Sequence, residues 1–271
     1  MKKIVIRRVR TKRPRPISTS SKKAAKRMLS YETVKKFNPS MLELGDISKP
    51  CQEIEAITAV FDLSGFTRFC NQVDSYLTIP RFFNEFLEWF FGIVREKLTE
   101  REHGKRISVW AEFPILAKFL GDGLLLLWNA QNLTEAKICR LIAILYDICY
   151  AYKHEFYPKM KMVVNKPPNV LRCGVARGKV FSVGNGKDYV GHCINNATRL
   201  SQVGNLSFCF PHSGFQVQEH MPVEYSDLFV PKYVSIRGVG DNELVWVVKE
   251  EFNRLPEKNK DLFRNLEPVL T

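Results

Sequence analysis

Two apolar runs joined by Gly121-Asp122-Gly123 constrain the fold of this chain more than any other stretch. Residues 115–128 are largely apolar on both sides of that short link, a pattern typical of a β-hairpin with an acidic tip. The apolar run 54–61 predicts a strand that ends at Asp62 and is followed by Ser64-Gly65. Because a hairpin forces antiparallel pairing, the chain does not fit a doubly wound parallel sheet.

The remaining sequence predicts helices that alternate with further strands. Residues 170–176 and 180–183 form a predicted hairpin across Arg177-Gly178, and 99–113 is predicted to be an insertion. This order fits an α+β fold, with a mostly antiparallel, ferredoxin-like sheet and helices packed on it. The predicted helices cover 80–98, 134–157 and 191–203, and the predicted late strands cover 206–210, 233–237 and 243–248.

The net charge of +13 resides in the N-terminal tail. Residues 1–30 hold twelve Lys and Arg and no acid, which leaves 29 basic against 28 acidic residues in the rest. The tail also carries Pro14, Pro16 and a Ser-Thr-Ser-Ser run, a composition typical of a disordered arm. Such an arm is most often only solvated, and contact with an anionic surface, nucleic acid or membrane, is the alternative. We expect a basic tail at 1–30, a lead-in at 31–53, the main domain at 54–249 and a charged extension at 250–271.

The seven cysteines indicate a reducing compartment. They form no Cys-x-x-Cys pair and no zinc-type spacing with histidine, so we expect buried free thiols. The longest apolar stretch, 141–152, is interrupted by Asp147 and is shorter than the roughly 20 residues that cross a bilayer. No apolar segment of signal-peptide length follows the N-terminal charges. The sequence therefore predicts a cytoplasmic protein with no transmembrane segment.

Asp62 and Asp122 are candidate metal ligands. Both adjoin apolar strands, so their carboxylates are expected to meet at one end of the sheet. Hard divalent ions such as Mg²⁺ and Mn²⁺ take oxygen ligands and usually share their coordination shell with substrate phosphates. An aspartate at a strand end or in a glycine-rich turn is more often a turn residue with local hydrogen bonds. For either aspartate alone, that simpler interpretation is the better one.

A third stretch, 187–200, leads from a loop into a helix on which Asn195 and Arg199 lie one turn apart on the same face. An amide beside a guanidinium suits a sugar hydroxyl and a phosphate, although an isolated helix arginine is usually just solvated. Together, the three stretches resemble the class III nucleotidyl cyclases, the catalytic domain of adenylate and guanylate cyclases. The resemblance covers 54–248 and depends on the stretches 61–67, 118–123, 188–199 and 236–240.

The resemblance implies a metal-dependent enzyme that cyclises a nucleoside triphosphate and releases pyrophosphate. Two divalent ions per site, Mn²⁺ or Mg²⁺, would be bound by Asp62, Asp122 and the Leu63 carbonyl. The catalytic residues would be Asn195, which would orient the ribose, and Arg199, which would neutralise charge on the α-phosphate. The implied substrate-binding residues are Ser64, Gly65, Phe66 and Thr67 through their backbone N–H groups, Lys118 and Asp188 at the base, and Arg237 at the outer phosphates, where the family normally has lysine.

The family forms its sites between two subunits, with metals from one and the asparagine and arginine from the other. This chain carries both sets, which predicts a homodimer with two sites. Lys118 and Asp188 match positions that select adenine, which argues for ATP. A short, free-standing cyclase with an insertion at 99–113 instead resembles the bacterial pyrimidine cyclases of Pycsar anti-phage systems, which make cyclic UMP or cyclic CMP. We expect a pyrimidine product, with adenylate cyclase as the alternative; a palm-domain polymerase and a non-catalytic nucleotide-binding module fit the acidic, amide and arginine residues less well.

Overall fold

The computed structural model describes residues 29–103 and 106–264. Contacts divide the chain into two units, Met1–Leu42 and Glu43–Thr271. Apart from its last two residues, the predicted basic tail at 1–30 lies outside the described residues. The described part of the first unit holds only short elements, and the larger unit holds the sheet and the candidate site.

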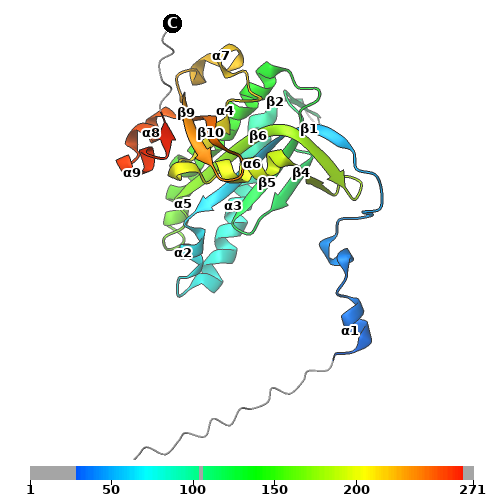
Figure 1. The fold of residues 1–271 in the computed structure, drawn as a ribbon. Coiled ribbons are helices and arrows are strands. Elements are labelled where there is room, and N and C mark those ends of the chain that lie inside the picture. The colour runs from blue at the N-terminus through cyan, green and yellow to red at the C-terminus, as the bar shows by residue number, and fades with distance from the viewer. Residues whose placement is uncertain (1–28, 104–105, 265–271) are drawn as a thin grey trace, which may run out of the picture. The chain divides into compact units, whose positions relative to one another are not determined.

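The larger unit is organised around a nine-stranded sheet, with a separate two-stranded ribbon formed by β2 and β3 (Figure 1). The strands are β1 (Glu53–Ser64), β2 (Thr99–His103), β3 (Arg106–Val109), β4 (Leu116–Phe119), β5 (Gly123–Asn129), β6 (Val170–Val183), β7 (Asp188–Val190), β8 (Phe208–Pro211), β9 (Phe229–Ile236), β10 (Gly240–Val248) and β11 (Phe263–Arg264). Their order in the sheet is β11-β9-β10-β8-β6-β1-β5-β4, with β7 paired to β6. Every pairing is antiparallel except that of β6 with β8. The predicted α+β fold with a mostly antiparallel sheet is confirmed.

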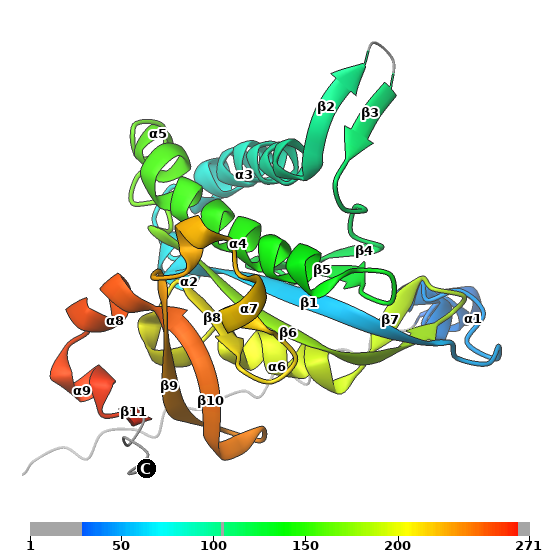
Figure 2. The same ribbon diagram turned by 90° about the horizontal axis from the view of Figure 1, so that it is seen from above.

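Helices cover both faces of this sheet: Figure 2 shows α3 and α4 on one face and α6 on the other. The helices and helical turns are α1 (Tyr31–Lys35), η1 (Pro39–Leu42), α2 (Phe66–Cys70), α3 (Ser75–Leu98), α4 (Glu135–Ala151), η2 (Tyr152–Phe156), α5 (Tyr157–Lys161), α6 (His192–Leu200), η3 (Val203–Asn205), α7 (Val217–His220), η4 (Val223–Tyr225), α8 (Lys249–Arg254) and α9 (Glu257–Lys260). Thr134 caps α4 by accepting a hydrogen bond from the Lys137 N–H. Among the described residues, no helix combines the length and the apolar character needed to cross a membrane.

Each face of the sheet carries its own apolar core. The core beneath α3 and α4 is rich in phenylalanine, since Phe86 and Phe90 follow the predicted helical spacing and are fully buried. The Phe90 ring meets the Phe61 ring edge-on, with 4.8 Å between centroids. Side chains alternate along a strand, so Phe61 points into this core while Val60 and Asp62 lie on the opposite face, with α6.

Helix α6 lies directly on the sheet because residue 174 is glycine. A Cβ at Gly174 would overlap the Ala197 carbonyl oxygen and the Ser201 backbone nitrogen. Backbone therefore rests on backbone at this point, and the contact fixes Asn195 and Arg199 relative to β6.

The prediction of a hairpin across Arg177-Gly178 is wrong, because residues 170–183 form the single strand β6. Arg177 pairs with Ile57 of β1 in register, and its guanidinium forms ion pairs with Glu55 (2.6 Å) and Glu135 (2.7 Å). These tertiary contacts override the turn preference of the Arg-Gly pair. The predicted insertion at 99–113 contains the ribbon of β2 and β3.

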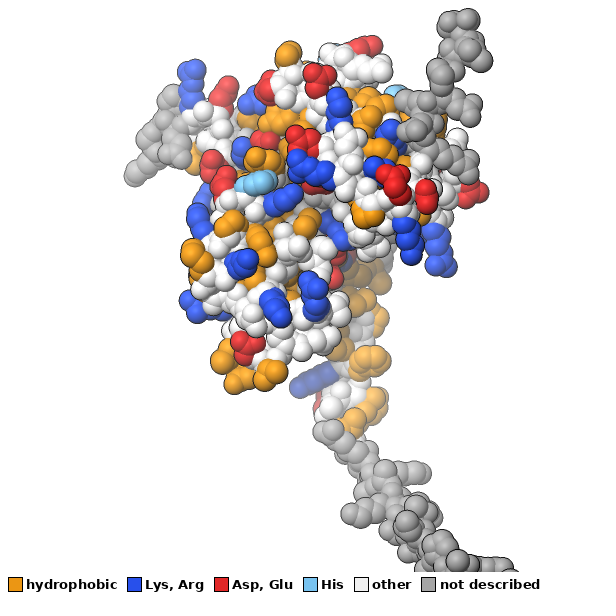
Figure 3. All heavy atoms as spheres, turned by 90° about the vertical axis from the view of Figure 1, so that its left-hand side faces the viewer, with side chains coloured by type: hydrophobic (Ala, Val, Ile, Leu, Met, Phe, Trp, Pro, Cys, Tyr) orange, Lys and Arg blue, Asp and Glu red, His pale blue; other side chains and the backbone are white. Residues whose placement is uncertain are grey.

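Charges outside the tail are mixed. On the face drawn in Figure 3, Lys and Arg side chains are scattered among acidic and apolar ones. All seven cysteines are free; Cys51 is exposed, Cys70 is half-buried and the other five are buried.

Candidate active site

The β1–β5 pairing brings Asp62 and Asp122 to the same end of the sheet. Asp62 pairs in register with Gly123, the first residue of β5, so Asp122 lies one residue beyond that pair. The Leu63 N–H donates a 3.0 Å hydrogen bond to the Asp122 carbonyl, which ties the hairpin tip to the end of β1. Two carboxylates that are sixty residues apart in sequence therefore belong to one small region, where β1 ends and the turn between β4 and β5 lies.

The two carboxylates carry like charges that repel each other. Burial raises the pKa of Asp62, and the negative charge of Asp122 raises the same pKa further, while Arg172 acts in the opposite direction. Asp62 is half-buried, so water screens this repulsion incompletely. A cation between the two groups would relieve the repulsion.

Arg172 lies next to Asp62 and was not among the site residues predicted from the sequence. It faces Asp62 across the β1–β6 pairing and donates hydrogen bonds to Ser64 Oγ (2.8 Å) and Asn205 Oδ1 (3.0 Å). Its Nε is buried and has no hydrogen-bond partner in the described part of the chain. Its place in the apolar run 170–176 could have identified Arg172 as a site residue, because a charged side chain inside a central strand needs a partner.

The donor set fits a hard divalent cation. Asp62 and Asp122 supply carboxylate oxygens, and Leu63 supplies a backbone carbonyl between them in the chain. Within 29–103 and 106–264, no group of three or more His, Cys, Asp or Glu residues could hold a metal. A two-carboxylate site of this kind leaves coordination positions for substrate oxygens, as Mg²⁺ and Mn²⁺ sites commonly do.

Lys118 of β4 and Asp188 of β7 form an ion pair across seventy residues of sequence. The other carboxylate oxygen, Asp188 Oδ1, accepts a 2.9 Å hydrogen bond from the Tyr189 N–H, which orients the carboxylate. Lys118 is about half exposed and Asp188 is largely covered. The two residues implied in base recognition thus lie together, with a donor and an acceptor side by side.

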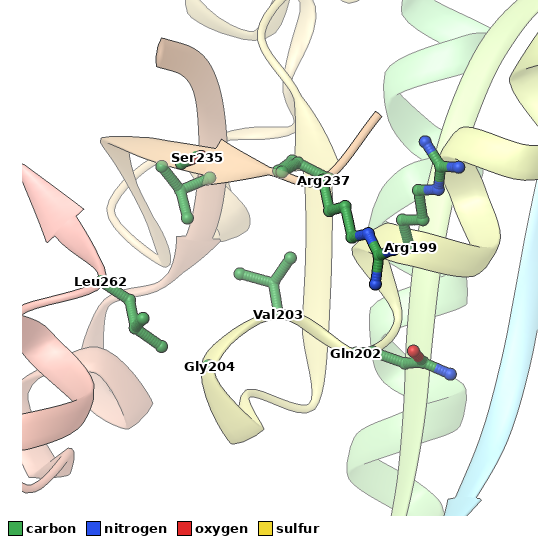
Figure 4. Close-up of a pocket in the computed structure, with 9 residues that line it drawn as sticks. Arg199, Gln202, Val203, Gly204, Ser235, Arg237 and Leu262 are labelled. Atoms are coloured by element: carbon green, nitrogen blue, oxygen red, sulfur yellow. The ribbon is translucent and has the colours of Figure 1, made fainter. Parts of the chain in front are cut away.

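Arg199 and Arg237 line one cavity of about 570 Å³ on the α6 side of the sheet (Figure 4). Arg199 projects from the last turn of α6, and Arg237 follows directly after β9. Both side chains are exposed, and none of the described residues that line the cavity is acidic. Two guanidinium groups without a neighbouring carboxylate make this cavity suitable for a polyanion.

The predicted site residues form separate groups within the chain. Asp62 and Asp122 meet at the sheet end, Lys118 pairs with Asp188, and Arg199 shares its cavity with Arg237. Asn195 is exposed on α6, four residues before Arg199. Across the described ranges, no hydrogen bond or ion pair joins the aspartates to Asn195, Arg199 or Arg237.

Comparison with known proteins identifies the fold. No protein-family model and no curated protein matches the chain. Three of the solved structures that match have TM-scores of 0.51 to 0.53, and the matches cover 74% of this chain and 94% to 98% of theirs. They are the guanylyl cyclase Cya2 (15% identity), the adenylyl cyclase CyaB from P. aeruginosa (12%) and the catalytic core of a rhodopsin-guanylyl cyclase with converted specificity in complex with ATPalphaS (18%).

The fold is that of a class III nucleotidyl cyclase domain. At 12% to 18% identity the likeness concerns the fold, and the chemistry has to be argued from the side chains of this chain. The cyclase fold takes up about three quarters of the chain, so the remaining quarter has no counterpart in these three structures.

Proposed function

We propose that this protein is a nucleotidyl cyclase, which converts a nucleoside triphosphate into a 3′,5′-cyclic nucleotide and pyrophosphate. The observation that carries the proposal is the convergence of Asp62 and Asp122 at one end of the sheet. The cavity of Arg199 and Arg237 supports it, because it offers two cations to a triphosphate. The shared fold with adenylyl and guanylyl cyclases favours the same reaction.

The reaction would join the ribose 3′-oxygen to the α-phosphorus as the bond from that phosphorus to its bridging oxygen breaks, so that pyrophosphate leaves and the 3′-hydroxyl gives up its proton. Two Mg²⁺ or Mn²⁺ ions held by Asp62, Asp122 and the Leu63 carbonyl would supply Lewis acidity at these oxygens. Asn195 would hold the ribose for in-line approach. Arg199 would neutralise the charge that develops on the α-phosphate.

The remaining phosphates would be bound by groups at two places in the fold. Backbone N–H groups of Ser64, Gly65, Phe66 and Thr67 would donate hydrogen bonds to phosphate oxygens, since the first N–H groups of a helix lack partners within it. Arg237 would bind the β- and γ-phosphates through the N–H donors of its guanidinium. The class III nucleotidyl cyclases normally have a lysine at this position.

We infer a pyrimidine triphosphate as the substrate, with ATP as the alternative. The Lys118–Asp188 pair offers one donor beside one acceptor. Cytosine and adenine each present a ring-nitrogen acceptor beside an amino group, so this pair serves a pyrimidine as well as it serves adenine. The insertion at 99–113, on which the resemblance to bacterial pyrimidine cyclases partly rests, favours a cyclic UMP or cyclic CMP product that serves as a second messenger in bacterial anti-phage defence.

The proposed enzyme is a homodimer with two sites, each combining aspartates of one subunit with Asn195 and Arg199 of the other. A mixing experiment tests this arrangement. The Asp62→Ala protein should be inactive and the Arg199→Ala protein should lose about 10²-fold in kcat, whereas an equilibrated mixture should recover about a quarter of wild-type activity, because half the dimers then hold one intact site. A mixture as inactive as its components, or an active preparation that sediments as a monomer, would contradict the shared site.

The decisive experiment for the reaction offers the purified protein ATP, GTP, CTP and UTP with Mn²⁺ and identifies the products by mass spectrometry. We expect a cyclic nucleotide from one triphosphate, and no product from Asp62→Ala or Asp122→Ala. Asp227→Ala is the matched control, because Asp227 is exposed and precedes β9, which lies four strands away from β1 in the sheet order. Absence of any cyclic product with all four nucleotides would overturn the proposal, and the base of the product decides between pyrimidine and adenine.

A further inference from the structure

The turn between β9 and β10 lies directly against the Arg199 side chain. Gly238 in this turn has φ +71, and a Cβ there would lie 2.5 Å from Arg199 Nη1 and 3.0 Å from both Cζ and Nη2. These are the three outer atoms of the guanidinium, so its head group rests on the backbone of the turn. Only glycine leaves room for that contact while adopting the positive φ without strain.

No other partner holds the head group in the described part of the chain. There, Arg199 makes no hydrogen bond or ion pair with a side chain, and it is exposed on α6. An exposed arginine normally samples many rotamers because its side chain is long. The contact with Gly238 therefore locates the guanidinium against the turn that follows β9.

The turn itself is firmly held. The Val239 N–H donates a 2.9 Å hydrogen bond to the Ile236 carbonyl and closes the turn. Strand β9, which leads into it, is paired on one side with β10 and on the other with β11, where Phe263 lies opposite Val234. Because Arg237 belongs to the same turn, one rigid element sets the place of both cations.

We propose that Gly238 is the positioning residue for Arg199: the missing side chain lets the turn between β9 and β10 hold the guanidinium in place before substrate or a second subunit arrives. This inference builds on the proposed function, in which Arg199 stabilises charge on the α-phosphate. A side chain at 238 would displace the guanidinium by about 1 Å, a misplacement that can reduce turnover by about 10²-fold.

The test is a double-mutant cycle between Gly238→Ala and Arg199→Ala, with kcat, KM and affinity for inorganic tripolyphosphate as readouts. In the wild-type background, Gly238→Ala should lower kcat about tenfold or more, with a smaller change in KM, since Arg199 acts on transition-state charge. In the Arg199→Ala background, the same substitution should have almost no further effect. Tripolyphosphate affinity, measured by calorimetry, should show the same non-additive pattern.

Two further variants separate positioning from backbone strain. Gly214→Ala is the matched control, because Gly214 has φ +88 but its Cβ would lie 3.5 Å from Arg177 Cβ, an ordinary contact. It should keep the wild-type kcat. Gly238→Asn provides a variant that tolerates positive φ yet still displaces Arg199, so it should lose turnover even if Gly238→Ala fails to fold.

The outcomes of the cycle distinguish this inference from the cyclase proposal. Equal losses in both backgrounds, or wild-type values for both Gly238 variants, would overturn the positioning role. If no nucleotide is cyclised by the wild-type protein but the tripolyphosphate cycle is non-additive, the cyclase proposal fails and the positioning role stands.

Discussion

Replacing Gly174 by alanine would lift α6 off the sheet. The added Cβ would overlap backbone atoms of Ala197 and Ser201 and lie 2.7 Å from the Leu200 carbonyl carbon. None of these is the flexible end of a side chain, so the whole helix has to move by about 1 Å to restore normal packing. Forcing an extra methyl group into such a contact costs about 1–3 kcal/mol of unfolding free energy.

The same movement carries the candidate catalytic groups with it. Asn195 and Arg199 lie on α6, so a shift of about 1 Å in the helix should lower kcat by about 10²-fold. The loss of stability should lower Tm by about 2–4 °C for each kcal/mol in a domain of this size. Most molecules remain folded at 25 °C, and the loss of turnover should therefore greatly exceed any loss of folded protein.

Cyclisation assays and thermal unfolding of the same preparations measure both effects. Gly178→Ala is the matched control on the same strand beneath the same helix, because its Cβ would lie 3.4 Å from Cys193 Cβ and needs only a small adjustment. We expect near-wild-type kcat and Tm for this control. A Gly174→Ala protein with lowered Tm and undiminished kcat would refute the idea that the exact place of α6 matters for turnover.

Four other predictions concern charge, metal binding, base recognition and packing. Asp62→Asn should raise the unfolding free energy above pH 3.8. Because the pKa of Asp62 is raised in the folded state, that state binds the proton more tightly than the unfolded chain does, and the unfolding free energy of the wild type falls as pH rises from 3.8 through the folded-state pKa. Urea titrations at several pH values would measure this fall and its absence in the variant. Mn²⁺ should stabilise the wild type by about 2.7 kcal/mol at 100 times its Kd and should not stabilise Asp122→Asn, and its affinity should weaken at low pH as the proton competes for Asp62. Lys118→Ala should change the preference among triphosphates more than it changes metal binding, measured as kcat/KM for each base. Phe86→Ala should cost about 3–5 kcal/mol in urea unfolding, because this fully buried ring packs against several others, whereas Phe91→Ala, about half exposed, should cost much less.

Local pattern predicted the parts of the site that depend on local structure. Gly121-Asp122-Gly123 between apolar runs specifies a hairpin, and the apolar strand before Asp62 specifies a central partner for it, so the meeting of the two aspartates followed from the sequence. The spacing of Asn195 and Arg199 specifies one helix face.

Register and close packing had no local signal. Arg172 faces Asp62 only because β1 and β6 pair in one register, and the sequence alone does not give that register. Helix α3 begins at Ser75, five residues before the predicted start, since Pro80 lies inside the helix near its first turns instead of at its first position. The contact of Gly238 with Arg199 joins two elements far apart in sequence, and a glycine in a turn does not indicate what lies against it.

The distribution of charge in the chain favours the proposed reaction on energetic grounds. Asp62 and Asp122 place two negative charges together, and burial of Asp62 makes its ionisation less favourable still. Arg199 and Arg237 place two positive charges on one cavity, whose lining is free of acidic residues in the described part of the chain. The repulsion between the aspartates destabilises the free protein, and such costs are typical of functional sites. A complex of a divalent cation with a triphosphate would suit both groups of charges at once. The cation would offset the repulsion between the aspartates, and the phosphates would pair with the arginines.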